Sequence, residues 1–306
     1  MQQKDLPRPK IDFFRSNHRA YYIAAGEFVQ QSLGLRVPFY LCHILNELGF
    51  EAYVTAQKQA PKLRTPLLTQ EVINKHKSDG RETVAVYSEA MWGNVLKGDV
   101  VVHWIMSAAG KIRERIVGAD EPCFYWYHGY SMKNKKDIKP LVLPVLDEYL
   151  YNADGVDDSK RSGFAYYAHK YLIEDRKVHD KLTNSGISLC QDIKRTPGEI
   201  ADILRSVKVL YIYEDSAIAI EAALCGCVVV FVHTEYTRYA IGKQNPEDMY
   251  DYCVDEIKLD PNVLYQPNGA VLRKYREQFN DGSGGLADFV KITQSVPLKQ
   301  MNSDIV

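Results

Sequence analysis

The stretch that most restricts the fold of this chain runs from Tyr211 to Val232 and reads YIYEDSAIAIEAALCGCVVVFV. An apolar run opens it, a segment with the helical period follows, and the second run, Val228 to Val232, is entirely apolar. A strand that is apolar on both faces belongs inside a parallel sheet. Because a helix between two parallel strands forms a right-handed crossover, the stretch predicts an α/β unit.

Short apolar runs alternate with helix-period segments over most of the chain, which predicts parallel sheets covered by helices. The strands expected in the first half are Ala20 to Ala25, Phe50 to Thr55, Val84 to Tyr87, Val100 to Ile105, Cys123 to Tyr127 and Leu141 to Val145. Those expected in the second half are Gly163 to Ala168, Ile187 to Cys190, Val207 to Tyr213 and Val228 to Val232. The expected helices are Val37 to Leu48, Pro197 to Arg205, Ser216 to Leu224, Val271 to Phe279 and Leu286 to Thr293.

The chain is long enough for two domains. Its 306 residues correspond to about two domains of roughly 150 residues each. The polar segment Asn152 to Ser162 has no apolar period and predicts a linker. We therefore expect a Rossmann-like domain at residues 1–152, a second at 163–268, and C-terminal helices at 269–306 that can pack back on the first domain.

Composition excludes several classes of protein. With 46% hydrophobic and 25% charged residues, the chain has enough apolar material for a full core. The formal net charge of -1 lacks the basic excess of a dedicated nucleic-acid binder, so we expect no nucleic-acid partner. No G-x-G-x-x-G motif follows Ala20 to Ala25, which argues against a dinucleotide dehydrogenase.

The cysteines and the N-terminus indicate a cytoplasmic protein. None of the six cysteines is paired at the spacing of a zinc knuckle, so they predict buried, reduced thiols. The N-terminal segment lacks the apolar core of a secretory signal, and no run reaches the ~18 apolar residues that cross a bilayer. The basic stretch Lys133 to Lys139 predicts a charged loop, although contact with anionic lipid or a polyanionic acceptor stays open, as does the oligomeric state.

A candidate anion site follows the strand that ends near Tyr213. Backbone N–H groups of Ser216 and Ala217 begin a helix and can face a diphosphate. Glu221, on the same helix, is an acceptor that can bind both hydroxyls of a ribose. The simpler interpretations are an N-cap for Ser216 and an ion pair with a nearby Lys or Arg for Glu221.

The run from Ser216 to Val230 resembles the nucleotide-sugar segment of GT-B glycosyltransferases, especially family 4-like bacterial enzymes that build surface polysaccharides. In those enzymes a Glu, seven residues and a second Glu precede an Ala-rich CG-x-PVV sequence. Here Tyr213 stands at the position of the first Glu and Val228 at that of the Pro. The resemblance implies that Glu214 or Asp215 takes over the contact with the donor sugar.

Further short motifs extend the resemblance over most of residues 20–235. They are Gly34-Leu35-Arg36, the run Leu45 to Tyr53, Tyr87-Ser88-Glu89 with Gly93-Asn94, and Val101 to Met106 with Gly110. The resemblance implies two Rossmann-like domains facing across a cleft. It also implies that the loop with Gly34 and Arg36 approaches the donor phosphate, although an ordinary turn with a solvent-facing Arg36 is the simpler interpretation.

The resemblance also suggests the groups that carry the reaction. Lys170 follows the first strand of the second domain, where a basic residue would neutralise the leaving diphosphate without a metal; a solvated lysine is the alternative. His169 and Arg176 are weaker candidates for that role. Asp157 and Asp158 lie in the expected linker, so a solvated charge cluster is the simpler interpretation, and we expect no catalytic metal.

The acceptor base is expected at a strand end of the first domain. The candidates are Glu89, His103 and His128, and Glu89 ranks first because it combines a strand end with a Gly93-Asn94 turn. A lone histidine in an aromatic run is more often a structural residue.

The sequence as a whole predicts a metal-independent glycosyltransferase that moves a sugar to a glycan or lipid-linked acceptor in surface-polysaccharide synthesis. The nucleotide-diphosphate sugar is a co-substrate, and no bound cofactor is expected. A nucleotide-sugar epimerase of the same fold is one alternative. Because Tyr213 replaces the usual acidic residue, a non-catalytic nucleotide-sugar-binding or scaffold protein is the other.

Overall fold

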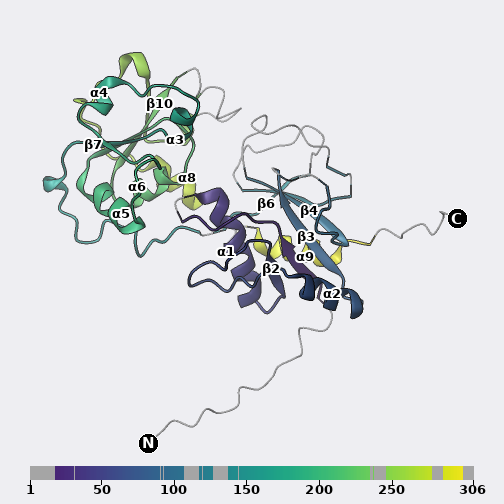
Figure 1. Ribbon diagram of the computed structural model, residues 1–306. Helices are drawn as coiled ribbons and strands as arrows, with labels where there is room; N and C mark the ends of the chain where they lie inside the picture. The colour runs from purple at the N-terminus through teal and green to yellow at the C-terminus, as the bar shows by residue number, and fades with distance from the viewer. Residues whose placement is uncertain are drawn as a thin grey trace, which may run out of the picture.

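The structure is a computed structural model that describes residues 18–30, 32–89, 91, 93–106, 117–118, 120–126, 137–143, 145–234, 237, 246–277 and 285–298. These residues form two α/β units, each built on a parallel sheet, at the right and left of Figure 1. The predicted fold class, two Rossmann-like units facing across a cleft, is confirmed.

The first unit contains a sheet in the order β2-β1-β3-β4-β5-β6. Its strands are β1 (Ala20–Ile23), β2 (Ala52–Val54), β3 (Thr83–Ser88), β4 (Val100–Ile105), β5 (Cys123–Tyr125) and β6 (Lys139–Pro140), and its early helices are α1 (Leu33–Glu47) and α2 (Gln70–Ser78). All neighbouring strands are parallel. The chain leaves β1 toward one side for β2 and returns to the other side for β3. Ligands bind α/β sheets at such a switch point, beyond the carboxyl ends of the strands.

The second unit contains a sheet in the order β11-β10-β9-β7-β8. Its strands are β7 (Phe164–Tyr167), β8 (Ile187–Ser188), β9 (Val209–Ile212), β10 (Val228–His233) and β11 (Tyr252–Asp255). Its helices are α3 (His169–Ile173), α4 (Asp180–Thr183), α5 (Pro197–Ser206), α6 (Ile218–Leu224) and α8 (Ala270–Glu277), with 3-10 turns η2 (Asp158–Lys160), η3 (Pro246–Asp248) and η4 (Glu256–Lys258). The predicted crossover is confirmed, because β9 and β10 are parallel neighbours joined by α6.

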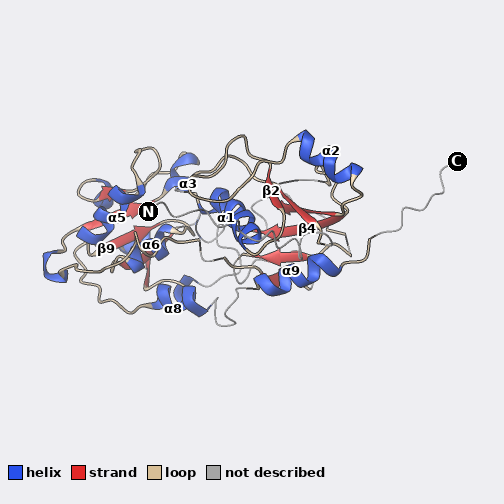
Figure 2. Ribbon diagram, turned by 90° about the horizontal axis from the view of Figure 1, so that it is seen from below, coloured by secondary structure: helices blue, strands red, loops and turns tan. Residues whose placement is uncertain are grey.

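The last helix, α9 (Leu286–Ser295), packs on the first unit although it follows the second unit in sequence. Figures 1 and 2 show it alongside the strands of the first sheet. Phe289 is fully buried, with its ring centroid 5.7 Å from that of Tyr21 and 5.0 Å from that of Phe124. Thr293 and Tyr21 share a hydrogen bond of 2.8 Å between their hydroxyls.

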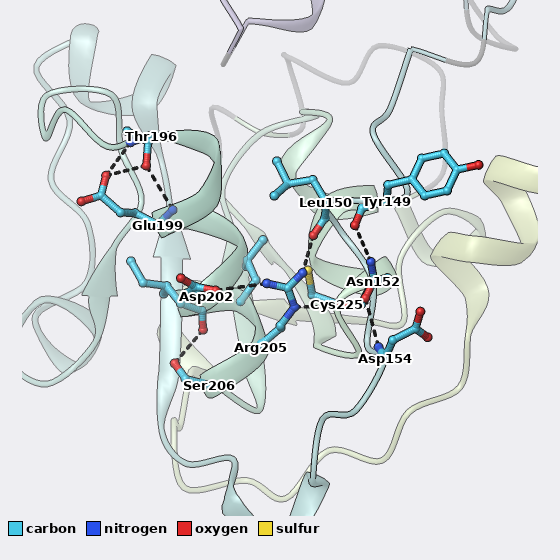
Figure 3. Close-up of polar contacts among 12 residues, drawn as sticks. Tyr149, Leu150, Asn152, Asp154, Thr196, Glu199, Asp202, Arg205, Ser206 and Cys225 are labelled. Atoms are coloured by element: carbon cyan, nitrogen blue, oxygen red, sulfur yellow. Dashed lines mark hydrogen bonds and ion pairs between the residues drawn. The ribbon is translucent and has the colours of Figure 1, made fainter. Parts of the chain in front are cut away.

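Two arginines hold the expected linker against the second unit. Arg205 of α5 donates to the carbonyl of Asn152 at 3.0 Å and to that of Leu150, as Figure 3 shows. Arg161, 5% exposed, donates to the carbonyls of Leu204, Val207 and Cys225. The segment before β7 is therefore attached to the second unit by buried hydrogen bonds.

The structure corrects some predicted elements. Helix α1 begins at Leu33, four positions before the expected Val37, and Pro38 lies inside it. The last strand of the first sheet is Lys139–Pro140, so a strand over Leu141 to Val145 was wrong. The described apolar side chains there, at 141–143 and 145, are at most 2% exposed. They are buried although they belong to no strand, so an apolar run by itself did not indicate a strand. Helix α2 was not predicted because its sequence is polar, and strand β11 was not predicted because it is short.

No helix in the described ranges is long and apolar enough to cross a membrane. All six cysteines are free thiols, and five of them are buried.

Candidate functional site

A cavity of about 460 Å³ lies between the two units, where the carboxyl ends of strands from both sheets meet. The described lining from the first unit is Ser32, Leu33, Gly34, Met106 and Trp126. The second unit contributes Tyr167, His169, Lys170, Ile173, Gln191, Asp215, Ser216, Ala217, Ala219, Ile220, Met249, Tyr250, Val271, Lys274 and Tyr275.

The polar wall of the cavity comes from strand ends of the second unit. Lys170 follows β7, Gln191 follows β8, and the run from Asp215 to Ala217 follows β9. Because these three strands are neighbours in one parallel sheet, their carboxyl ends bring the residues together. The Lys170 side chain is exposed to the cavity, and no carboxylate in the described chain lies within ion-pair distance of its ammonium.

The start of α6 presents backbone donors to this cavity. Ala217 is the N-cap residue, and its side chain offers no cap. The N–H groups of Ser216 and Ala217 donate to no acceptor among the described residues. Free N–H groups before a helix are able to bind an anion. Asp215, beside them, accepts a hydrogen bond of 3.3 Å from the hydroxyl of Tyr250.

Glu214 is occupied inside the protein. It is 1% exposed, and its Oε2 accepts hydrogen bonds from the backbone N–H groups of Lys170 at 2.6 Å and Tyr171 at 3.3 Å. It therefore caps the first turn of α3, the short helix that begins at His169 and carries Lys170. Glu214 fixes the position of Lys170, and it is not among the residues that line the cavity.

Arg36 and Glu221, predicted to contact different parts of a donor, form an ion pair with each other. Arg36 Nη2 lies 3.0 Å from Glu221 Oε1, and the side chains are 2% and 9% exposed. Arg36 Nη1 donates to the carbonyl of Gln30 at 2.6 Å. Because Arg36 belongs to α1 of the first unit and Glu221 to α6 of the second, the pair joins the two units.

Burial and the ion pair act on Glu221 in opposite directions. Desolvation is the larger effect and raises the pKa of its carboxyl above the usual value, and the adjacent guanidinium of Arg36 offsets part of that rise by charge and by hydrogen bonding. The phenol of Tyr151 lies close to both groups, and its pKa is raised by burial and by the charge of Glu221. A buried carboxylate of this kind depends on its partner to remain charged.

A second cavity, of about 360 Å³, adjoins the first on the second unit. Tyr167, Gln191 and Ser216 line both cavities, so they form the ridge between them. Glu221 lines the second cavity. The other described lining residues are Val29, Tyr151, Leu189, Cys190, Ile193, Lys194, Arg195, Ile200 and Ile218.

The remaining predicted residues of the first unit have different positions. Gly34 lies in the first turn of α1, not in a loop, and lines the main cavity. Glu89 is not among the residues lining the cavity, but its Oε2 accepts from the backbone N–H of Met106, which does line it, at 2.9 Å. His103 is 1% exposed and lies 2.7 Å from Glu121 Oε2. His128 lies outside the described residues.

His169 and Arg176, the weaker candidates for the role of Lys170, differ in their surroundings. His169 lines the cavity, and desolvation lowers the pKa of its ring below the usual value, so the ring is neutral at pH 7 and does not substitute for the charge of Lys170. Arg176 is half-exposed, 5.9 Å from the ring of Tyr171, and does not line the cavity.

The linker aspartates form local ion pairs. Asp157 caps η2 and pairs with Lys160, while Asp158 lies 2.8 Å from Arg161. Their interpretation as a solvated charge cluster agrees with these contacts. Of the stretch Lys133 to Lys139, residues 133–136 lie outside the described part. Within the described ranges, no group of three or more His, Cys, Asp or Glu side chains is placed to hold a metal ion.

Sequence reasoning missed several lining residues. Gln191 follows a predicted strand, so the strand-end rule that selected Lys170 and Glu89 also applied to it. Trp126 was predicted inside the strand Cys123 to Tyr127, whereas β5 ends at Tyr125 and places Trp126 just beyond the strand. Lys274 and Tyr275 come from α8, which contacts α6. No local signal in the sequence links α8 to the cavity, because that placement depends on helix packing.

Comparisons with known proteins give structural likeness only. No protein-family model and no curated protein matches the chain. It is similar to the solved structure of WaaG, a glycosyltransferase involved in lipopolysaccharide biosynthesis, with 9% identity, 90% of this chain and 94% of the other covered, and a TM-score of 0.43. A glycosyltransferase from Rickettsia africae ESF-5 gives 9% identity, coverage of 91% and 92%, and a TM-score of 0.44.

The spinosyn forosaminyltransferase SpnP gives 11% identity, coverage of 92% of this chain and 96% of the other, and a TM-score of 0.40. All three are glycosyltransferases, the class that the sequence motif resembles. At these identities and TM-scores the likeness carries no conclusion about activity, and the two parallel sheets with the cavity between them define the fold.

Proposed function

We propose that this protein transfers a sugar from a nucleotide-diphosphate sugar to a hydroxyl group of an acceptor bound in the same cavity. One observation carries the proposal. The neighbouring strand ends of the second unit bring the N–H groups of Ser216 and Ala217 and the ammonium of Lys170 to one interdomain cavity. Neutral amide donors beside a flexible cation suit a diphosphate.

The same groups serve the chemical step. Negative charge grows on the diphosphate as the bond to the sugar breaks, so a cation at that position stabilises the transition state more than the bound donor. In our proposal Lys170 supplies this charge, and no metal ion is required. The capping of α3 by Glu214 supports the proposal, because it fixes the backbone that carries Lys170.

The nucleoside is proposed to occupy the second cavity. The ridge of Tyr167, Gln191 and Ser216 borders both cavities, so a ligand with its diphosphate on the ridge reaches the second one. Glu221 lines that cavity and has one oxygen, Oε1, held by Arg36. Its carboxylate is our proposed acceptor for the ribose hydroxyls.

The acceptor is proposed to lie against the first unit, where Met106 and Trp126 line the cavity. Asp215 and the neutral ring of His169 are lining groups that can take a proton from an acceptor hydroxyl at pH 7. Glu89 acts as the base in our proposal only after the hydrogen bond from the backbone N–H of Met106 to its carboxylate breaks. Following the sequence resemblance, we propose a glycan or lipid-linked acceptor in surface-polysaccharide synthesis on the cytoplasmic side.

Nucleotide binding tests the proposal first. The protein should be screened by thermal shift with UDP, GDP, their sugars and other nucleotide-linked sugars. One nucleotide class should raise the melting temperature of the protein, since a ligand that binds only the folded state stabilises that state. Calorimetry with that nucleotide diphosphate should then show about tenfold weaker binding for Lys170→Met, the loss of one charge-assisted contact. Lys177→Met is the matched control, because Lys177 is exposed on the same unit and pairs with Asp180.

The outcomes separate the proposed function from its alternatives. Equal affinity of both lysine variants would contradict the role of Lys170. Release of an epimer from the donor alone would identify an epimerase. Nucleotide binding with neither transfer nor hydrolysis of the sugar, over a panel of glycan and lipid-linked acceptors, would identify a non-catalytic binding protein. Failure of every nucleotide to bind would exclude the proposed function.

A further inference from the structure

The ion pair between Arg36 and Glu221 joins α1 of the first unit to α6 of the second. Its two members come from different units and are almost completely buried. Removing one partner from a buried pair leaves an uncompensated charge, which is far more costly than losing a surface pair. The position of Glu221 therefore depends on whether the first unit is docked.

The geometry indicates that Arg36 holds Glu221 in place and does not itself contact a ligand. Its Nη1 donates a hydrogen bond to the carbonyl of Gln30 and its Nη2 donates one to Glu221, and Arg36 lines neither of the two cavities. Glu221, in contrast, does line the second cavity. Arg36 thus acts on that cavity through the carboxylate that it holds.

We propose that Arg36 is a positioning residue that orients Glu221 and favours its ionised form, so that docking of the first unit sets the nucleotide affinity of the second. This inference rests on the proposed function. Its consequence is thermodynamic: if docking strengthens nucleotide binding, nucleotide binding must strengthen docking by the same factor. The nucleotide site is then incomplete on the second unit alone.

The titratable and charged groups around Glu221 are Arg36 from α1, Tyr151 from the linker, Cys225 from its own helix, and Lys194 and Arg195 in the cavity lining. Burial raises the pKa of Tyr151 and raises that of Cys225 to about 11, so both stay neutral near pH 7. Lysine and arginine stay charged there. Glu221 is the carboxyl of this set, and its negative charge is lost when it is protonated.

The direction in which nucleotide affinity changes with pH follows from the charge that Glu221 carries when it binds the ligand. Only the ionised carboxylate accepts from two hydroxyls, so protonation of Glu221 weakens binding as pH falls. Without Arg36 the two influences that lower the pKa of Glu221 are gone, while desolvation remains. The loss of affinity must then begin at a higher pH in the variant than in the wild type.

Calorimetric titrations of the full-length protein with UDP and GDP, between about pH 6 and about pH 9, test this inference. Arg36→Met should bind at least about tenfold more weakly near neutral pH, the value of one hydrogen bond to a charged group. Its affinity should recover as pH rises, and this recovery should lie at a higher pH than any pH-dependent change in the wild type. Arg36→Lys should restore most of the binding.

Arg64→Met is the matched control, since Arg64 is exposed and lies 3.9 Å from Glu47 on α1. It should bind as the wild type does. An Arg36→Met protein with unchanged affinity would overturn the inference. So would an equal loss at every pH, because a purely structural defect does not depend on the charge of Glu221.

Hydrogen exchange without nucleotide separates this inference from the proposed function. Arg36→Met should speed amide exchange in α1 and α6 relative to α2, and the double variant Arg36→Met with Glu221→Met should reverse much of that change, because it leaves no unpaired charge. Unchanged exchange would exclude coupling between the units. If the wild type bound neither nucleotide while exchange changed as expected, the proposed function would fail and the coupling of the units would stand.

Discussion

At the scale of single residues, carboxylates that the sequence offers for ligand binding are held by groups of the protein. Glu214 accepts from two backbone N–H groups of α3, and Glu221 pairs with Arg36. A carboxylate after a strand binds whichever donors lie within reach. Spacing in the sequence selected both residues as candidate ligand contacts. It did not identify their partners, which lie 44 and 185 positions away.

The capping role of Glu214 gives a prediction for stability. Glu214→Ala removes two hydrogen bonds to the first turn of α3, so the free energy of unfolding should fall by about 2–4 kcal/mol. Urea unfolding followed by circular dichroism measures this change. Glu47→Ala, which removes an exposed carboxylate 3.9 Å from Arg64, should change the stability by less than about 1 kcal/mol. Equal midpoints for the two variants would show that the cap contributes nothing.

At the scale of elements, α6 illustrates why the predicted strands and helices are mostly correct. The helix ends at Leu224, and Gly226, just after the C-cap residue, has a backbone φ of 88°, while the N–H of Cys227 donates to the carbonyl of Ala222. This left-handed ending favours glycine, and the sequence marks it directly. Helix α1 was predicted to start four residues too late, because Gly34 is a poor helix former that nevertheless lies in the first turn of the helix.

Gly226 gives a prediction for this helix ending. An added Cβ would be strained by the positive φ and would lie 2.6 Å from Nη2 of the buried Arg161. Gly226→Ala should therefore destabilise the protein by about 1–3 kcal/mol. Gly198→Ala is the control, since the nearest atom to its Cβ is 3.9 Å away and its φ is ordinary. Thermal melting should show a lower midpoint for the first variant and an unchanged or higher one for the second.

At the scale of the whole molecule, the chain crosses between its two units more than once. After α8, whose residues pack with the second unit, α9 returns to the core of the first unit. All three tryptophans, Trp92, Trp104 and Trp126, belong to the first part of the chain. Trp104 lies in the core of the first unit and Trp126 packs against it, so their fluorescence reports that unit, while circular dichroism reports both units.

The contribution of α9 to the stability of the first unit can be measured by comparing fluorescence with circular dichroism. Phe289→Ala should remove about 3–5 kcal/mol from the stability of the first unit, the cost of truncating a fully buried phenylalanine. The fluorescence midpoint in urea should fall accordingly. Phe231→Ala truncates an equally buried ring in the second unit, so it should lower the circular dichroism midpoint with a smaller change in fluorescence. Identical shifts with both probes would mean that the units unfold together.

The sequence by itself determined the α/β class, the β9-α6-β10 crossover and the strand ends that carry Lys170 and Ser216, because apolar periodicity and turn residues act over short distances. Only the tertiary structure decided that Arg36 meets Glu221, that Glu214 caps α3, and that α8 and α9 pack on different units. These contacts join residues far apart in the chain. Their free energy comes from burial and charge pairing in the assembled molecule, and no local pattern encodes which of the competing partners comes within reach.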